Sequence, residues 1–158
     1  MKRAQYAGRD FRRAVNIEDL RRMARRRLPN FSFEYVEGGS EDELALRRNR
    51  DVFERIAWVP RTLASVGTPD LATEILGDSC HLPLVIAPTG FNGLLWPQGD
   101  LALAKAAADA GIPFTLSTVS NYPVAKLTAE VPGRTWFQLY PMKEARVIDR
   151  LIDRAAEA

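Results

Sequence analysis

Three short apolar runs recur in the second half of the chain, and each is followed by a stretch with helical character. The runs cover residues 84–87, 113–116 and 135–140. The first run is continuously apolar, which is typical of a strand that is covered on both faces. Successive strand–loop–helix units favour a parallel sheet with right-handed crossovers. The sequence therefore predicts an α/β fold built from β/α units.

The helices of these units have recognisable signals. An alanine-rich amphipathic segment over residues 99–110 stops at Gly111, because glycine readily adopts the left-handed conformation that closes a helix. A short helix is predicted over residues 122–130, with Pro123 near its first turn. Apolar residues of the last segment recur at helical spacing on one face: Val147, Ile148, Leu151, Ile152 and Ala155.

Two further helices are predicted in the first third of the chain. Asn16 is placed to cap a helix that continues to Arg27, and Pro29 ends it. A second helix is expected to begin with Ser40 as its N-cap and Glu43 at the third position, the arrangement of a capping box.

A loop and a hairpin are predicted before the first β/α unit. Residues 58–70 contain two prolines and one glycine and are typical of a loop. The stretches 71–76 and 80–84 flank Gly77-Asp78, a pair that favours a hairpin turn. The hairpin would connect the N-terminal helices to the repeated units.

The sequence predicts a cytoplasmic protein. No apolar run approaches the roughly 18 residues that a membrane span needs, and the N-terminus lacks the apolar region of a signal peptide. Cys80 is the single cysteine and has no partner for an internal disulfide, which suits a reducing compartment.

Charge is unevenly distributed along the chain. The net charge is +2, but residues 1–27 hold ten basic and three acidic residues, so they carry +7 and the remainder carries −5. Residues 1–15 are predicted to form a flexible basic leader. A basic segment can bind nucleic acid or anionic lipid. Because no nucleic-acid-binding motif is recognisable, a solvated leader running into an arginine-rich helix face is the favoured interpretation, without a nucleic-acid partner.

Three β/α units are too few to complete a parallel sheet. Such a sheet needs helices on both faces or closure into a barrel, and an eightfold barrel takes about 250 residues. The predicted fold is therefore a (β/α)8 TIM barrel, of which the chain holds the N-terminal helices, a hairpin and about the first three units. We expect residues 16–158 to be part of a single domain, completed by a C-terminal part in the same or a second chain.

Small and polar residues follow the first two predicted strands, at the edge where β/α proteins build their active sites. Pro88, Thr89 and Gly90 follow the first strand, and Gly90 would let a flat ligand approach the backbone closely. Ser117 and Thr118 end the second strand and offer hydroxyl groups. These positions form one half of a candidate site.

The third predicted strand adds two polar side chains. Gln138 and Tyr140 alternate with Leu139, so both are expected to face inward while Leu139 faces the helices. Gln138 can donate and accept hydrogen bonds, which suits the edge of a heterocycle. Tyr140 could bind a carboxylate or an oxygen that carries developing charge. The alternative is that both are satisfied polar residues of a barrel interior.

Several short motifs lie between residues 16 and 158: Leu28-Pro29, Phe33-Glu34-Tyr35, Gly38-Gly39-Ser40-Glu41-Asp42, Asn49-Arg50, Ala87-Pro88-Thr89-Gly90, Trp96-Pro97-Gln98-Gly99-Asp100, Leu116-Ser117-Thr118 and Trp136-Phe137-Gln138-Leu139-Tyr140. In this order and spacing they resemble the FMN-dependent 2-hydroxy acid dehydrogenases and oxidases. The sequence is most similar to the mandelate dehydrogenase branch. Gly90 stands where glycolate and lactate oxidases usually carry alanine.

The resemblance implies FMN as the cofactor, no metal, and oxidation of an (S)-2-hydroxy acid to a 2-keto acid. The backbone of Pro88-Thr89-Gly90 would lie beside the flavin ring, and Ser117 and Gln138 would hydrogen-bond its polar edge. Tyr35 and Tyr140 would be catalytic residues that contact the substrate, Tyr35 at its carboxylate and Tyr140 at its carboxylate and oxygen.

The resemblance also implies a substrate class. Position 119 is valine where glycolate oxidase has tryptophan, and the smaller side chain would leave room for a large or aromatic substrate such as mandelate. The absence of a methyl group at Gly90 is linked in this family to how readily reduced flavin reacts with oxygen.

Catalytic histidine and arginine residues of this family come from later strands, so the isolated chain is expected to be inactive. His81 precedes the first strand and would lie at the wrong end of the barrel for a catalytic base. The family commonly forms tetramers, which implies a homo-oligomer. Members of the mandelate branch can be membrane-associated, which would place the protein peripherally at the inner face of the membrane, without a span.

Two other classes stay open at this point. The chain could be a binding module that docks through its basic leader on lipid or nucleic acid. It could also be an inactive truncated chain with exposed sheet edges.

Overall fold

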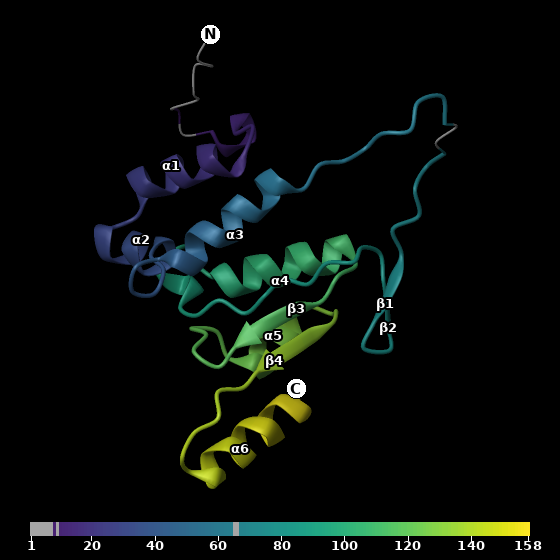
Figure 1. Ribbon diagram of the computed structural model, residues 1–158. Coiled ribbons are helices and arrows are strands. Elements are labelled where there is room, and N and C mark those ends of the chain that lie inside the picture. Colours follow the sequence, from purple (N-terminus) through teal and green to yellow (C-terminus); the bar gives the residue numbers. More distant parts are fainter. Residues whose placement is uncertain (1–7, 9, 65–66) are drawn as a thin grey trace. The chain divides into compact units, whose positions relative to one another are not determined.

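The computed structural model describes residue 8, residues 10–64 and residues 67–158. These residues belong to two compact units, Met1–Ser65 and Val66–Ala158, whose elements are labelled in Figure 1. The predicted flexible leader lies in large part outside the described residues. Within it, Phe11–Arg13 form a short 3-10 helix capped by the Asp10 side chain.

The first unit consists of three helices, α1 (Ile17–Arg27), α2 (Asn30–Glu37) and α3 (Leu44–Arg55). The side chain of Asn16 accepts a hydrogen bond from the backbone N–H of Asp19 at 2.9 Å, so Asn16 caps α1 as predicted. Helix α1 ends at the residue before Leu28-Pro29, also as predicted.

The predicted capping box at the start of α3 is wrong. Helix α3 begins at Leu44, and its N-cap is Glu43 in a left-handed conformation. Ser40 instead closes a turn, because its carbonyl accepts a hydrogen bond from the N–H of Glu43 at 2.9 Å. The Glu43 carboxylate reaches back as a capping box requires, but its donor is the N–H of Gly39 at 3.1 Å. Because of this backbone turn, α3 begins about one helical turn later in the sequence than predicted.

The arginine-rich face of α1 is paired with acidic side chains within the first unit. Arg21 binds Glu18 at 3.0 Å and also contacts Glu37, and Arg25 binds Glu34 at 2.7 Å. Hydrogen bonds to Glu18 and Glu37 raise the pKa of the Arg21 guanidinium. Part of the excess positive charge that the sequence places here is therefore offset by Glu34 and Glu37 of α2.

The predicted hairpin forms at the start of the second unit. Strands β1 (Thr73–Ile75) and β2 (Asp78–Cys80) pair antiparallel, with Leu76 and Gly77 between them. Both central residues have positive φ, 52° and 84°, as a type I′ turn requires. The turn therefore lies one residue earlier than predicted, and the strands are shorter. Between α3 and β1, the residues that the structure describes form no helix or strand.

Two strands of the second unit form a parallel pair. Strand β3 (Phe114–Ser117) runs beside β4 (Thr135–Gln138), with Ser117 opposite Gln138. Helix α4 (Gly99–Ala110) precedes β3, α5 (Val124–Glu130) connects the strands, and α6 (Ala145–Ala156) follows β4. This order confirms the predicted β/α arrangement for the second and third units (Figure 1).

The predicted first strand is reduced to a single bridge. Ile86 pairs with Phe114: its N–H donates to the carbonyl of Pro113, and its carbonyl accepts from the N–H of Thr115, both at 3.0 Å. Leu84 and Val85 are exposed, so coverage of this run on both faces is not observed. Among the described residues, Ile86 has a bridging neighbour on one side only.

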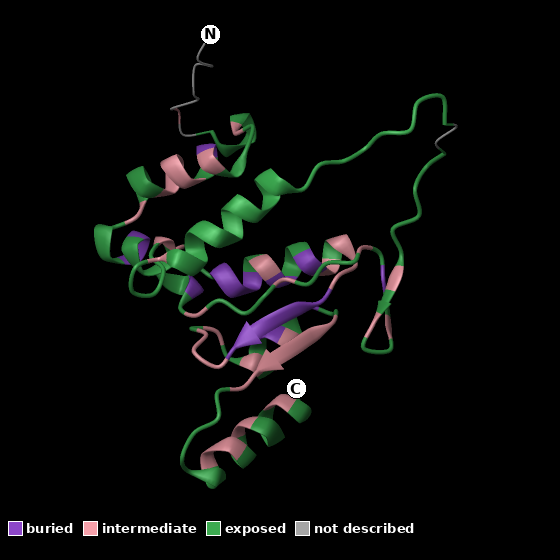
Figure 2. Ribbon diagram, viewed as in Figure 1, coloured by how far each residue is buried: buried purple, intermediate pink, exposed green. Residues whose placement is uncertain are grey.

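The core of the second unit lies between β3, α4 and α5 (Figure 2). Seven buried apolar residues form it: Leu101, Ala104, Ala107, Phe114, Leu116, Leu127 and Val131. Because side chains alternate along a strand, Phe114 and Leu116 point toward the helices and Ser117 points to the opposite face of the sheet. The packing of Phe114 and Leu116 against the helices thus determines the direction in which the Ser117 side chain points. Among the helices of the described residues, none is long and apolar enough to cross a membrane.

Candidate active site

The carboxyl ends of β3 and β4 bring Ser117 and Gln138 together. The Ser117 hydroxyl donates to Oε1 of Gln138 at 3.1 Å, and the backbone N–H of Thr118 approaches the same oxygen at 3.4 Å. Parallel register makes this possible, because Ser117 and Gln138 are opposite each other. Nε2 of Gln138 donates to no residue that the structure describes. The pair therefore presents an amide donor at the edge of the sheet.

Thr118 links the end of β3 to the chain that leaves β4. Its hydroxyl donates to the carbonyl of Gln138 and accepts from the backbone N–H of Tyr140 at 3.0 Å. Strand β4 ends at Gln138, so the predicted strand through Tyr140 is too long and strand alternation does not orient that side chain. The Tyr140 side chain is 51% exposed. Its backbone position is set by Thr118 instead.

The segment Pro88-Thr89-Gly90 follows the bridge at Ile86. Pro88 and Thr89 are exposed and Gly90 is half-buried. The next residue, Phe91, donates its backbone N–H to the carbonyl of Val119 at 3.2 Å, just beyond the end of β3. The backbone predicted to lie beside a flat ligand is therefore tied to the same sheet edge as Ser117.

Tyr35 belongs to the other compact unit. It lies on α2, and its side chain is 53% exposed. The strand-end residues described above all belong to the second unit. The role of Tyr35 stays a prediction.

His81 lies at the opposite end of β3 from Ser117. Its backbone N–H donates to the carbonyl of Gly111 at 3.0 Å, and Gly111 ends α4 shortly before β3 begins. This placement agrees with the prediction that His81 is at the wrong end for a catalytic base. Within the described part of the chain, no cluster of three or more His, Cys, Asp or Glu side chains could hold a metal ion.

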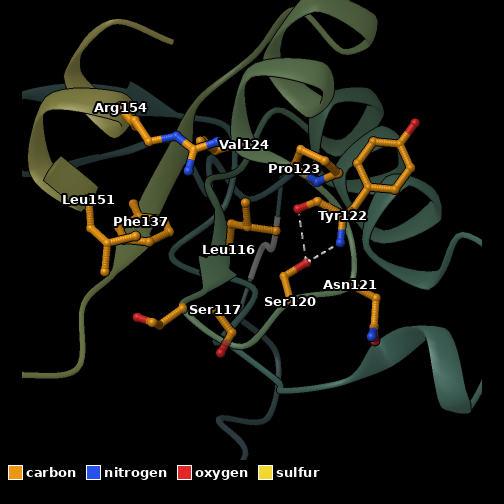
Figure 3. A pocket seen from close by; sticks show the side chains of 11 residues that line it. Leu116, Ser117, Ser120, Asn121, Tyr122, Pro123, Val124, Phe137, Leu151 and Arg154 are labelled. Carbon is orange, nitrogen blue, oxygen red and sulfur yellow. Dashed lines mark hydrogen bonds between the residues drawn. The ribbon is translucent and has the colours of Figure 1, made fainter. Parts of the chain in front are cut away.

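A cavity of about 280 Å³ opens beside the helix-facing side of the sheet (Figure 3). Leu116, Ser117 and Phe137 of the two strands line it, and α6 contributes Leu151 and Arg154. Gln138 and Tyr140 do not line it. The predicted cofactor-binding residues therefore do not gather around this cavity as a group.

A buried carboxylate was not assigned any role from the sequence. Asp100 is 2% exposed and accepts hydrogen bonds from Asn92 and Ser120. It lies in the Trp96-Pro97-Gln98-Gly99-Asp100 motif, in the first turn of α4. The sequence did contain one signal for Asp100, an acidic residue at a helix N-terminus. Solvent-exposed acidic residues are also common at that position, so the signal does not indicate burial.

Comparison with known proteins extends these observations. Residues 24–158 match the family described as FMN-dependent dehydrogenase. The (S)-mandelate dehydrogenase of Pseudomonas putida is 50% identical over 125 residues, which are 79% of this chain and 32% of that protein. Glycolate oxidase 1 of Zea mays is 36% identical over 144 residues, 91% of this chain and 39% of that protein.

A solved structure shows the same arrangement of elements. The crystal structure of the monotopic membrane protein (S)-mandelate dehydrogenase matches with a TM-score of 0.86 at 43% identity, over 92% of this chain and 39% of that one. The predicted fold is therefore confirmed: the chain has the fold of the N-terminal part of a (β/α)8 barrel. It belongs to the FMN-dependent dehydrogenase family. It spans about a third of the length of the curated relatives that it matches.

The strand-end residues fit the FMN that this family uses. A flavin ring carries carbonyl oxygens and ring nitrogens along one edge, so a site for it needs donors as well as acceptors. Nε2 of Gln138 is a donor without a partner among the described residues, and the Ser117 hydroxyl lies 3.1 Å from Oε1 of the same amide. Gly90, which has no side chain, follows two exposed residues in the adjoining segment. These groups suit the polar edge and the face of a flavin.

Proposed function

We propose that the complete protein oxidises a 2-hydroxy acid to the 2-keto acid, and that this chain supplies one side of its FMN site. Bound FMN would accept the hydride equivalent that leaves the substrate. The observation that carries the proposal is the amide of Gln138, held by Ser117 at 3.1 Å with its Nε2 group directed to no described residue. A preoriented donor of this kind suits a heterocycle edge.

Each remaining residue has a positioning or binding role in this proposal. The backbone of Pro88-Thr89-Gly90 would lie along the ring, and Gly90, which has no side chain, would allow a close approach. Tyr140 and Tyr35 would bind the substrate carboxylate, and Tyr140 would also contact the substrate oxygen. The proton acceptor would come from the part of the barrel beyond this chain, since the sequence has one histidine, His81, at the other end of β3.

The first experiment is native mass spectrometry on the protein purified from its source, followed by anaerobic addition of (S)-mandelate. We expect a complex larger than the 17.7 kDa chain that holds FMN and whose flavin absorbance bleaches with the hydroxy acid. A flavin-free 17.7 kDa species that neither binds added FMN nor bleaches would contradict the proposal.

A substrate with a large or aromatic side chain is the finer proposal. It rests on Val119, which lies two residues beyond the end of β3 and donates its backbone N–H to the Ser117 hydroxyl at 3.3 Å. The Zea mays relative is a glycolate oxidase, and the Pseudomonas putida relative is an (S)-mandelate dehydrogenase.

Changing Val119 to tryptophan should therefore reverse the substrate preference. We expect kcat/KM for mandelate to fall at least about tenfold relative to glycolate, because an overpacked pocket costs on the order of 1–3 kcal/mol. Steady-state kinetics of the flavin-loaded protein measure the ratio, and Val119→Ala, which adds no bulk, serves as the matched control. An unchanged ratio in Val119→Trp would remove Val119 from the substrate pocket.

We also propose a homo-oligomer in the cytoplasm, with peripheral membrane contact and no nucleic-acid partner. One relative, an (S)-mandelate dehydrogenase, is a monotopic membrane protein, which supports the membrane contact. High salt or carbonate should release the protein from membrane fractions. Retention after carbonate washing would contradict peripheral binding.

A further inference from the structure

Asp100 is a carboxylate held inside the second unit without a cation. It is 2% exposed, and no described Lys, Arg or His side chain forms an ion pair with it. A buried charge is costly unless hydrogen bonds replace its hydration. Two side chains do so: Nδ2 of Asn92 donates to Oδ1 at 2.7 Å, and the Ser120 hydroxyl donates to Oδ2 at 2.6 Å. The first turn of α4 adds a favourable dipole.

The two donors come from different loops. Asn92 belongs to the segment that follows Ile86, and its Nδ2 also donates to the carbonyl of Thr89 at 3.1 Å. Ser120 belongs to the segment that follows β3, and its hydroxyl accepts from the N–H of Tyr122 at 2.9 Å (Figure 3). One carboxylate therefore joins the loop that contains Thr89 to the loop that follows Ser117.

Three further contacts tighten the same junction. The N–H of Phe91 donates to the carbonyl of Val119, and the N–H of Gly93 donates to Oδ1 of Asn121, both at 3.2 Å. A Cβ atom at Gly99 would lie 2.8 Å from the carbonyl oxygen of Asn92. Asn92 therefore packs directly against the start of α4. The two loops thus have little freedom to move apart while Asp100 stays in place.

We propose that Asp100 is a positioning residue that sets the backbone of Thr89 and Gly90 relative to the end of β3. The inference rests on the proposed function, because these are the two surfaces against which the flavin would lie. Asp100 touches neither ligand nor substrate in this account. It acts through Asn92 on the Thr89 carbonyl and through Ser120 on the loop after Ser117.

The first test needs no flavin. Amide hydrogen exchange is measured on the full chain for the wild type, Asp100→Ala and the control Asp109→Ala, an exposed aspartate on the same helix. We expect Asp100→Ala to speed exchange at Phe91 and Gly93 at least about tenfold, because each amide spans the two loops. The amide of Thr115, bonded to Ile86 within the sheet, should keep its protection. Asp109→Ala should change none of them.

The second test uses the protein assembled with FMN. Asp100→Ala should weaken FMN binding about tenfold, because the backbone of Thr89 and Gly90 would no longer be held against the end of β3; quenching of flavin fluorescence measures the affinity. Asp100→Asn keeps an acceptor for Asn92 and should restore most of the affinity.

Equal loss of protection at Thr115, Phe91 and Gly93 would show a purely structural role and overturn the inference, as would unchanged exchange at Phe91 and Gly93. Loss of loop protection without any change in FMN affinity would also overturn it. If the wild type binds no FMN, the proposed function fails, whereas the exchange result still decides whether Asp100 joins the loops.

Discussion

Replacing Leu127 by alanine is expected to lower the free energy of unfolding of the second unit by about 3 kcal/mol, since buried leucines leave a cavity when truncated. Leu127 is 0% exposed and lies in the cluster that joins α5 to α4 and β3. Urea unfolding of the chain, followed by circular dichroism, measures the change.

Leu84→Ala is the matched control for that measurement. The same methyl groups are removed in the same unit, but Leu84 is 56% exposed. We expect a loss below about 1 kcal/mol, because little apolar surface returns to water. Equal losses for the two variants would mean that the cluster around Leu127 is not the packed core of the second unit.

Replacing Gln138 by leucine should weaken FMN binding by about 100-fold in the assembled protein. The amide is proposed to donate to the flavin edge, and its Oε1 accepts from the Ser117 hydroxyl at 3.1 Å. Leucine removes the donor and also leaves the Ser117 hydroxyl without this acceptor, and each unmet hydrogen bond costs roughly 1–3 kcal/mol. Titration of the apoprotein with FMN gives the affinity directly.

Gln138→Glu separates the two contributions. Glutamate keeps an acceptor for Ser117 and Thr118 but has no Nε2 donor, so the sheet edge should stay intact while FMN binding still falls. If Gln138→Leu binds FMN as tightly as the wild type, the amide of Gln138 does not contact the cofactor. If Gln138→Glu alone retains wild-type affinity, the acceptor matters and the donor does not.

Local signals in the sequence determined most of the helices. Asn16 offers its side chain to an exposed N–H, and Gly111 adopts φ 65° at the end of α4, where a Cβ would meet the His81 ring at 2.3 Å. Such signals depend on a few neighbouring residues, which is why α1, α4 and the order of the β/α units could be predicted.

Contacts between distant residues decided what local signals could not. The run at residues 84–87 has strand character, but a strand exists only where a neighbour pairs with it, and Ile86 alone finds one among the described residues. The end of β4 at Gln138 depends on the Thr118 hydroxyl, 20 residues away in sequence. The turn at Ser40 is different, because the backbone bond that replaces the predicted cap is local and joins Ser40 to Glu43.

In the candidate site, too, some features followed from the sequence and others only from the tertiary structure. The sequence by itself determined which residues end the strands, because strand ends follow from apolar runs and their polar successors. Only the tertiary structure revealed that Asp100 joins two of the loops, because burial and partners 8 and 20 residues away are not encoded in the motif around it. Hydrogen bonds across loops arise once packing has brought the loops together, and that packing is a property of the whole unit.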